Sequence, residues 1–341
     1  TASNDATTTN VLFLKNLRKI LRKSHYCVAC KVCQANCKFG NLLFDDNGKI
    51  SISDNCIKCG QCLEIDTGCL VYKSLWLSKG LGNMDKKRTL DCYAAHGPKI
   101  EWFQEFVKLG DDFNKNNSLG SAQKPMFNRF LKDAGIIDEK CNRTNLGEML
   151  INSELQDLSI WALMLVNLSY TPQVGWFVKS FEFNSLISRN EIISLLSTIS
   201  EIKDSALKAI PPTLKRISSL PLGQLGFGTN DKASKELGGL SFYRTAWHDV
   251  DAKVILYSLY KFAEACGDYY QFTLTRLMDP TVESDGVSPI QIFGLDKDTM
   301  TSILKGLATN YPDYISVAFT LDLDNINLRQ EKTSADVLGL F

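Results

Sequence analysis

Two runs of regularly spaced cysteines constrain this chain more than any other feature. Cys27, Cys30, Cys33 and Cys37 form a C-x2-C-x2-C-x3-C run. Cys56, Cys59 and Cys62 repeat the C-x2-C-x2-C spacing, and Cys69 follows six residues later. A [4Fe–4S] cluster needs four thiolates around a compact core, and three cysteines spaced by two residues on a tight loop can bind one face of it. The pattern predicts that these eight cysteines hold two [4Fe–4S] clusters.

The segment between the two runs predicts a β-hairpin. Asn41–Ser53 alternates apolar and polar residues on either side of Asp46-Asn47-Gly48, which is a hairpin-turn sequence. The chain therefore has the order cysteine run, hairpin, cysteine run, as in an internal duplication.

Zinc is the main alternative metal, because C-x2-C pairs also build four-cysteine zinc sites. Two triplets and two single cysteines match iron–sulfur clusters better than zinc. Disulfides are disfavoured because the chain has the features of a cytoplasmic protein, where thiols stay reduced. Electron transfer and a purely structural role for the clusters both remain open.

Residues 27–72 resemble the bacterial two-cluster ferredoxin module. In that module the fourth cysteine of each run binds the other cluster. The resemblance implies one cluster on Cys27, Cys30, Cys33 and Cys69, and another on Cys56, Cys59, Cys62 and Cys37. Lys38 and Leu70 stand where the family has proline after the fourth cysteine.

Charge divides the chain into two parts. Residues 1–99 carry 15 Lys and Arg against 8 Asp and Glu, whereas residues 100–341 carry 23 against 30. The expected organisation is a leader and basic amphipathic helix over residues 1–23, a two-cluster ferredoxin-like domain with its exit segment over 24–99, and a mainly helical domain over 100–341. The expected fold class is α+β. No apolar run is long enough for a transmembrane helix.

Apolar periodicity predicts helices across the second part. The expected helices are Glu101–Leu109, Pro125–Ala134, Leu146–Asn152, Leu158–Ser169, Glu191–Ile199, Ala206–Leu220, Val254–Ala265 and Thr299–Ala308, with a strand over Ile315–Leu323. Leu158–Ser169 is apolar on all sides, which predicts a buried helix. Pro211-Pro212 predicts that its helix breaks and restarts.

Three stretches, Met126–Leu150, Asn190–Gly228 and Pro289–Leu328, are similar to winged helix-turn-helix units. A helical bundle with a few hairpins fits the pattern as well. The acidic charge of this part disfavours DNA binding, because phosphate contacts supply most non-specific affinity. A local basic patch could contribute, and it comprises Lys203, Lys208, Lys215 and Arg216.

No catalytic motif is found, so whether the chain is an enzyme stays open. Cys92 and His96 form a C-x3-H pair that could share a metal or a proton if both lay on one helical face, and they are the only hint of a self-contained reductase. Cys141 and Cys266 have the context of ordinary thiols. His25 lies two residues before the first predicted ligand, where it could contact a cluster sulfur.

Beyond the ferredoxin-like module, the chain resembles the iron–sulfur tail and the following helical domain of bacterial proteins related to phosphoadenosine phosphosulfate (PAPS) reductase. The resemblance rests on KNLRKILRKSHYC, IDTGCLVYKSLWLSKG, NLSYTPQVGWFVK and GVSPIQIFGLD. It implies a cytoplasmic iron–sulfur electron-transfer or accessory protein that serves a PAPS-reductase-like, sulfur-transferring domain or subunit in a phage-defence or DNA-modification system. The alternative is a nucleic-acid- or protein-binding winged-helix adaptor whose clusters are structural.

Overall fold

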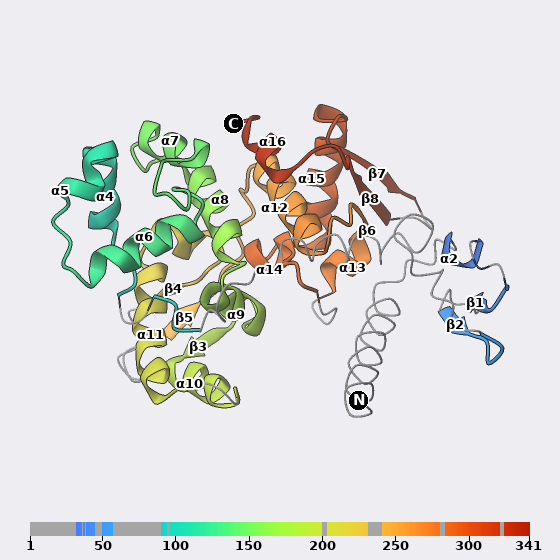
Figure 1. Cartoon of the computed structure of the whole chain (residues 1–341), viewed down its shortest axis with the longest axis horizontal. Helices are drawn as coiled ribbons and strands as arrows, with labels where there is room; N and C mark the ends of the chain where they lie inside the picture. The colour runs from blue at the N-terminus through green and yellow to red at the C-terminus, as the bar shows by residue number, and fades with distance from the viewer. Residues whose placement is uncertain are drawn as a thin grey trace, which may run out of the picture. The chain divides into compact units, whose positions relative to one another are not determined.

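The structure is a computed structural model, and it describes residues 32–35, 37, 39–44, 50–56, 90–93, 96–199, 203–230, 241–279, 284–320 and 324–341 (Figure 1). It divides into two compact units, Thr1–Met84 with Ala263–Phe272, and Asp85–Phe262 with Thr273–Phe341. The described residues form helices and small antiparallel sheets, which agrees with the expected α+β class.

The cysteine-rich unit contains a short helix and a hairpin. Helix α2 spans Val32–Ala35, and strands β1 (Leu42–Phe44) and β2 (Ile50–Ile52) pair antiparallel with Leu42 opposite Ile52. The two predicted arms of the hairpin are therefore confirmed, although the turn between them lies outside the described residues.

The larger unit begins with helices that pack through aromatic side chains. They are α4 (Ile100–Leu109), the 3-10 turn η3 (Gly110–Asp112), α5 (Phe113–Asn116), α6 (Gln123–Asp133) and α7 (Asn145–Asn152). Phe103 is fully buried, and its ring centroid lies 5.0 Å from those of both Phe127 and Trp161 in edge-on geometry. These rings explain the apolar spacing that predicted the helices.

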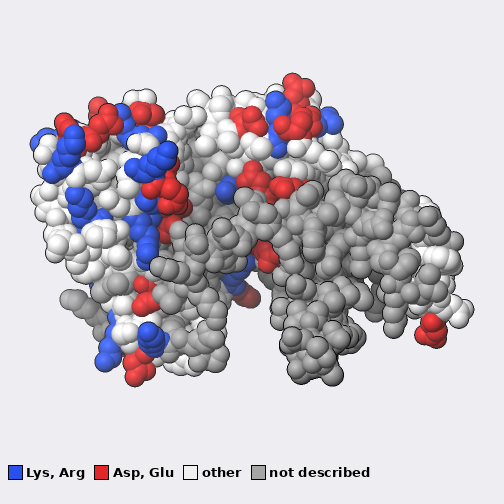
Figure 2. All heavy atoms as spheres, viewed as in Figure 1, with Lys and Arg blue, Asp and Glu red and all other residues white. Residues whose placement is uncertain are grey.

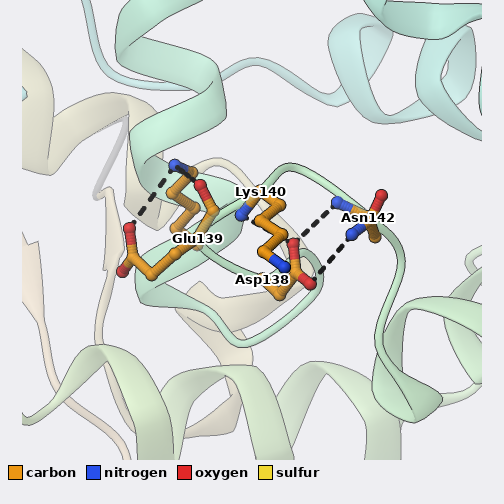
Figure 3. A network of polar contacts seen from close by, with 5 residues as sticks. Asp138, Glu139, Lys140 and Asn142 are labelled. Carbon is orange, nitrogen blue, oxygen red and sulfur yellow. Dashed lines mark hydrogen bonds and ion pairs between the residues drawn. The ribbon is translucent and has the colours of Figure 1, made fainter.

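The connection between α6 and α7 is a tight loop closed by one carboxylate (Figure 3). Asp138 accepts hydrogen bonds from the backbone N–H groups of Lys140 and Asn142, both at 2.8 Å, and from the Asn142 side chain at 3.1 Å. The Asn142 backbone N–H is the largest of the causes that lower the pKa of Asp138. Cys141 adopts a left-handed conformation in this loop, with φ of 64°.

Helix α8 (Leu158–Leu168) is buried on all sides, as its sequence predicts. Asp157 caps its first turn by accepting from the Ser159 N–H at 2.8 Å. Helix α9 (Pro172–Ser180) follows and was not predicted, although proline at its start is a common helix signal.

A three-stranded sheet and two helices come next. Strand β3 (Leu186–Ser188) leads into α10 (Arg189–Ser197), then α11 (Asp204–Ser218), the 3-10 turn η4 (Pro221–Leu225), β4 (Thr229–Asn230) and β5 (Ser241–Tyr243). The strand order is β3-β5-β4, and both pairings are antiparallel. Ser188 begins α10 with a reciprocal hydrogen-bond pair to Glu191.

The prediction of a helix break at Pro211-Pro212 is wrong, because α11 continues through both residues. Proline at these positions removes the N–H groups that would bond the carbonyls of Leu207 and Lys208. Leu207 and Lys208 are at least partly exposed, so water can bond their carbonyl oxygens. The buried face of α11, which includes Ile210, Leu214 and Ile217, stabilises the helix against this loss.

The remaining elements are α12 (Ala252–Ala265), β6 (Gln271–Thr273), α13 (Leu274–Met278), α14 (Pro289–Phe293), α15 (Lys297–Asn310), β7 (Ile315–Phe319), β8 (Asp324–Leu328) and α16 (Ser334–Leu338). Strands β7 and β8 pair antiparallel with Ile315 opposite Leu328. Ser288 caps α14 just before Pro289 by accepting from the Gln291 N–H at 3.3 Å. In Figure 1, helix α15 lies beside the β7–β8 hairpin.

A fully buried arginine joins several of these segments. The guanidinium of Arg244, just after β5, donates to four backbone carbonyls and lies 4.0 Å from the Phe183 ring centroid. The four carbonyls belong to Val178, Phe181, Gly226 and Gln291. Burial lowers the pKa of Arg244 to about 9, so the side chain stays charged at neutral pH. Two of these carbonyls lie at the C-terminal end of α9, one follows η4 and one lies in α14. Arg244 therefore fixes the relative positions of these three elements.

Candidate metal centre

Cys37 follows helix α2 in a turn that directs backbone N–H groups at its sulfur. The Cys37 N–H donates to the Gln34 carbonyl at 3.1 Å, and the Asn41 N–H donates to Cys37 Sγ at 3.4 Å. This Asn41 bond, followed by those of other N–H groups in residues 39–42, lowers the pKa of the Cys37 thiol, whereas burial opposes the shift. A concave set of N–H groups of this kind stabilises an anionic sulfur.

Asn41 connects this turn to the second cysteine run. Its backbone carbonyl accepts from the Ser53 N–H at 2.9 Å, which extends the β1–β2 ladder by one step. Its side-chain amide donates to the Asn55 carbonyl at 3.1 Å. The residue that binds Cys37 Sγ therefore also holds the backbone next to Cys56.

Cys56 lies on the return arm of the hairpin. Its N–H donates to the Ser53 carbonyl at 3.0 Å, in a turn that follows β2. Because Leu42 pairs with Ile52, Cys37 before β1 and Cys56 after β2 lie at the same, open end of the hairpin. The prediction assigns these two cysteines to one cluster, and both side chains are partly exposed.

The other predicted ligands lie outside what the structure describes. These are Cys27, Cys30, Cys59, Cys62 and Cys69, together with His25, and Cys33 is placed in α2 without a described side chain. Among the described residues, no group of three or more His, Cys, Asp or Glu side chains is arranged to hold a metal ion. The eight-ligand assignment therefore stays a prediction.

The described donors fit a thiolate-bound metal group. Cys37 is partly exposed, and a backbone N–H already donates to its sulfur, which is the kind of interaction that tunes cluster thiolates. The role of Asn41 was not predicted from the sequence, because its side chain carries no metal-ligand chemistry. A local sequence signal of the turn is Gly40 just before it, whose φ of 62° is a conformation that favours glycine.

Cys92 and His96 do not share a helical face. Residues 90–93 form a turn and residues 96–99 have no regular structure. Cys92 is buried, and its thiol donates to the Gln173 side chain at 3.9 Å. Burial, more than the nearby charge of Asp133, raises the pKa of Cys92 to about 12, so the thiol is protonated and a poor nucleophile at neutral pH.

The segment around Cys92 is instead a packed strap, defined here as residues 90–93 and 96–99. The Tyr93 hydroxyl donates to Asp133 on α6 at 2.9 Å, and Arg129 donates to the Cys92 carbonyl. Gly97 packs so closely on α11 that a Cβ there would lie 2.9 Å from the Thr213 carbonyl oxygen. The strap therefore contacts α6, α9 and α11.

Cys141 and Cys266 lie outside both cysteine runs. Cys141 is partly exposed in the loop of Figure 3, and Cys266 is buried. Within the part of the chain that the structure describes, no helix is long and apolar enough to cross a membrane.

Comparisons with known proteins found no relative of this chain. No family model matches the chain, and no similar curated protein or solved structure was found. The resemblance to PAPS-reductase-related proteins therefore stays a prediction.

Proposed function

We propose that the chain is an iron–sulfur electron-transfer or accessory protein that holds two [4Fe–4S] clusters within residues 24–99. The observation that supports this most directly is the hairpin, which brings Cys37 and Cys56 to one end and lets Asn41 bind both segments. When bound, a [4Fe–4S] cluster accepts and donates single electrons. The protein supplies thiolates, and backbone N–H groups that stabilise their negative charge.

The proposed partner is a PAPS-reductase-like, sulfur-transferring domain or subunit in a bacterial phage-defence or DNA-modification system. The sequence resemblance alone supports this choice. The basic charge of residues 1–99 favours an acidic partner surface. The proposed location is the cytoplasm, where reduced thiols are available for clusters.

Metal analysis of anaerobically purified full-length protein tests the cofactor. We expect about eight irons and eight acid-labile sulfides per chain, with paired-cluster signals in the EPR spectrum after dithionite reduction. Zinc without labile sulfide would overturn the proposal. Reversible redox cycling without iron loss supports electron transfer, and iron loss on a single reduction would contradict it.

Paired serine variants test which cysteines share a cluster. Cys37→Ser and Cys56→Ser should each remove about half of the iron, and the double variant should lose no more than either single variant. Cys33→Ser with Cys56→Ser should remove nearly all of it. Cys141→Ser is the matched control, because Cys141 lies outside both runs and should leave iron content unchanged.

A second candidate function is a winged-helix binding unit whose clusters are structural. Helix α9, strand β3, helices α10 and α11 and the strands β4 and β5 follow one another in the order of a winged helix. The strand order β3-β5-β4 also matches, because the last strand pairs between the first and second. In such units the second helix of the helix-turn-helix pair, here α11, contacts the partner.

The redox dependence of binding separates the two functions. A winged-helix adaptor with structural clusters should bind its partner equally well with oxidised and dithionite-reduced clusters. A marked change of affinity between the two states would contradict that role.

A further inference from the structure

Helix α11 and the strap form a cationic surface on a predominantly acidic part of the chain. Lys203–Ser218 carries four basic residues, Lys203, Lys208, Lys215 and Arg216, against one acidic residue, Asp204. In contrast, α15 with its N-cap carries two basic and two acidic residues. Figure 2 shows that Lys and Arg are interspersed with Asp and Glu over much of the described face in view.

The lysines on this surface have no acidic ion-pair partner among the described residues. Lys203, Lys208 and Lys215 are exposed, and so is Lys99 at the end of the strap. Within the described ranges, none of these four lysines forms an ion pair. Lys208 and Lys215 are two helical turns apart, about 10 Å along the axis, and lie on one face of α11.

The strap extends this basic surface beyond the helix. Gly97 lies against α11, with its carbonyl oxygen 3.5 Å from Nη1 of Arg216 and its Cα next to Thr213. Lys99 follows Gly97 by two residues along the chain and is exposed. The basic surface therefore comprises Lys99, Lys203, Lys208, Lys215 and Arg216.

The exposed face of α11 is polar rather than apolar. Its exposed residues are Asp204, Ser205, Lys208, Pro212 and Lys215. The large exposed hydrophobic side chains of the described residues all lie on other elements. Protein–protein interfaces depend on an apolar centre, whereas protein–DNA interfaces are polar and strongly positive.

We propose that α11 and the strap bind duplex DNA, with α11 in the major groove and the lysines at the phosphates. B-form DNA admits an α-helix in its major groove, whereas the major groove of duplex RNA is too narrow. The inference rests on the winged-helix candidate function and is independent of the clusters. It adds the partner, which is DNA, and the contacting residues.

Fluorescence anisotropy with a labelled 20-bp duplex of mixed sequence tests the proposal on the full, cluster-loaded chain. We expect a Kd on the order of 1–100 μM near 0.15 M salt, weakening as salt increases. Lys208→Ala with Lys215→Ala should weaken binding on the order of tenfold and reduce the log–log salt slope by about 2. Iron and sulfide content, measured in the same samples, should not change.

Lys297→Ala with Lys305→Ala on α15 is the matched control, because it also removes two exposed lysines from one helix. An equal loss of affinity in this control would overturn the assignment to α11 while leaving DNA binding intact. Absence of salt-dependent binding by the unmodified chain would overturn DNA binding altogether. Equally tight binding of a 20-bp RNA duplex would contradict the major-groove geometry. Equally effective competition by polyglutamate would contradict the choice of nucleic acid as the partner.

Discussion

The backbone N–H of Asn41 donates to Sγ of Cys37 at 3.4 Å, while the side chain of the same asparagine donates to the carbonyl of Asn55 at 3.1 Å. One residue therefore connects a predicted ligand of the first cysteine run to the residue that precedes a predicted ligand of the second. Under the proposed ligand assignment, the hairpin is what brings a cysteine of each run to the same cluster.

Asn41→Ala should weaken retention of that one cluster. The substitution removes the bond to the Asn55 carbonyl but keeps the backbone N–H at Cys37 Sγ. During anaerobic dialysis against a chelator, iron should fall from about eight toward about four per chain, because only one of two clusters is affected. Asn55→Ala is the control, since only its backbone carbonyl takes part. Equal iron loss in both variants would refute the role of the Asn41 side chain.

Arg244→Met should destabilise the larger unit strongly. The change leaves four carbonyls without their donor, and we expect a loss on the order of 3 kcal/mol. Chemical unfolding followed by tryptophan fluorescence measures it. Arg189→Met is the control, because Arg189 is exposed at the start of α10. This change should alter the free energy of unfolding by less than about 0.5 kcal/mol. A small effect at Arg244 would show that water replaces the guanidinium.

Local sequence patterns predicted the elements whose residues carry their own signals. Helices α4, α6, α7, α10 and α15 were predicted because their buried faces recur at helical spacing, whereas α9 was not predicted. The β1–β2 arms were predicted because their residues alternate on either side of a turn sequence. Strands β3, β4 and β5 were not predicted, because each has only two or three residues and depends on pairing with distant segments. The helix break predicted at Pro211-Pro212 is absent from α11, because burial of one face stabilises the helix through both prolines.

Only those residues of the candidate site whose type itself indicates metal binding, the cysteines, were predicted from the sequence. Cysteine spacing indicates thiolate ligands, but it does not reveal that Asn41 holds the two runs together. Arg244 was missed for the same reason, because its partners are backbone carbonyls whose positions depend on the tertiary fold.

Two glycines should respond to alanine in opposite directions. A Cβ at Gly223 would lie 2.1 Å from the Ser218 carbonyl oxygen, so Gly223→Ala should destabilise the protein by about 2 kcal/mol. Gly306 lies inside α15 with open space around it, so Gly306→Ala should stabilise by about 1 kcal/mol. Thermal unfolding of both variants checks the pair. A destabilising Gly306→Ala would mean that a segment covers this face of α15.

The Cys92 thiol should make stability fall as the pH rises above 9. Its pKa is raised to about 12 in the folded protein from about 9 in the unfolded chain, mainly because burial disfavours the thiolate. Between these values the folded state binds more protons, so its stability is complete below pH 9 and decreases as pH rises toward 12. Cys92→Ser keeps a hydrogen-bond donor to Gln173 and removes this titration. Thermal midpoints measured at pH 8 and pH 10 should therefore fall more for the unmodified protein than for the variant. Equal decreases would place the Cys92 sulfur in contact with solvent and contradict the buried contact with Gln173.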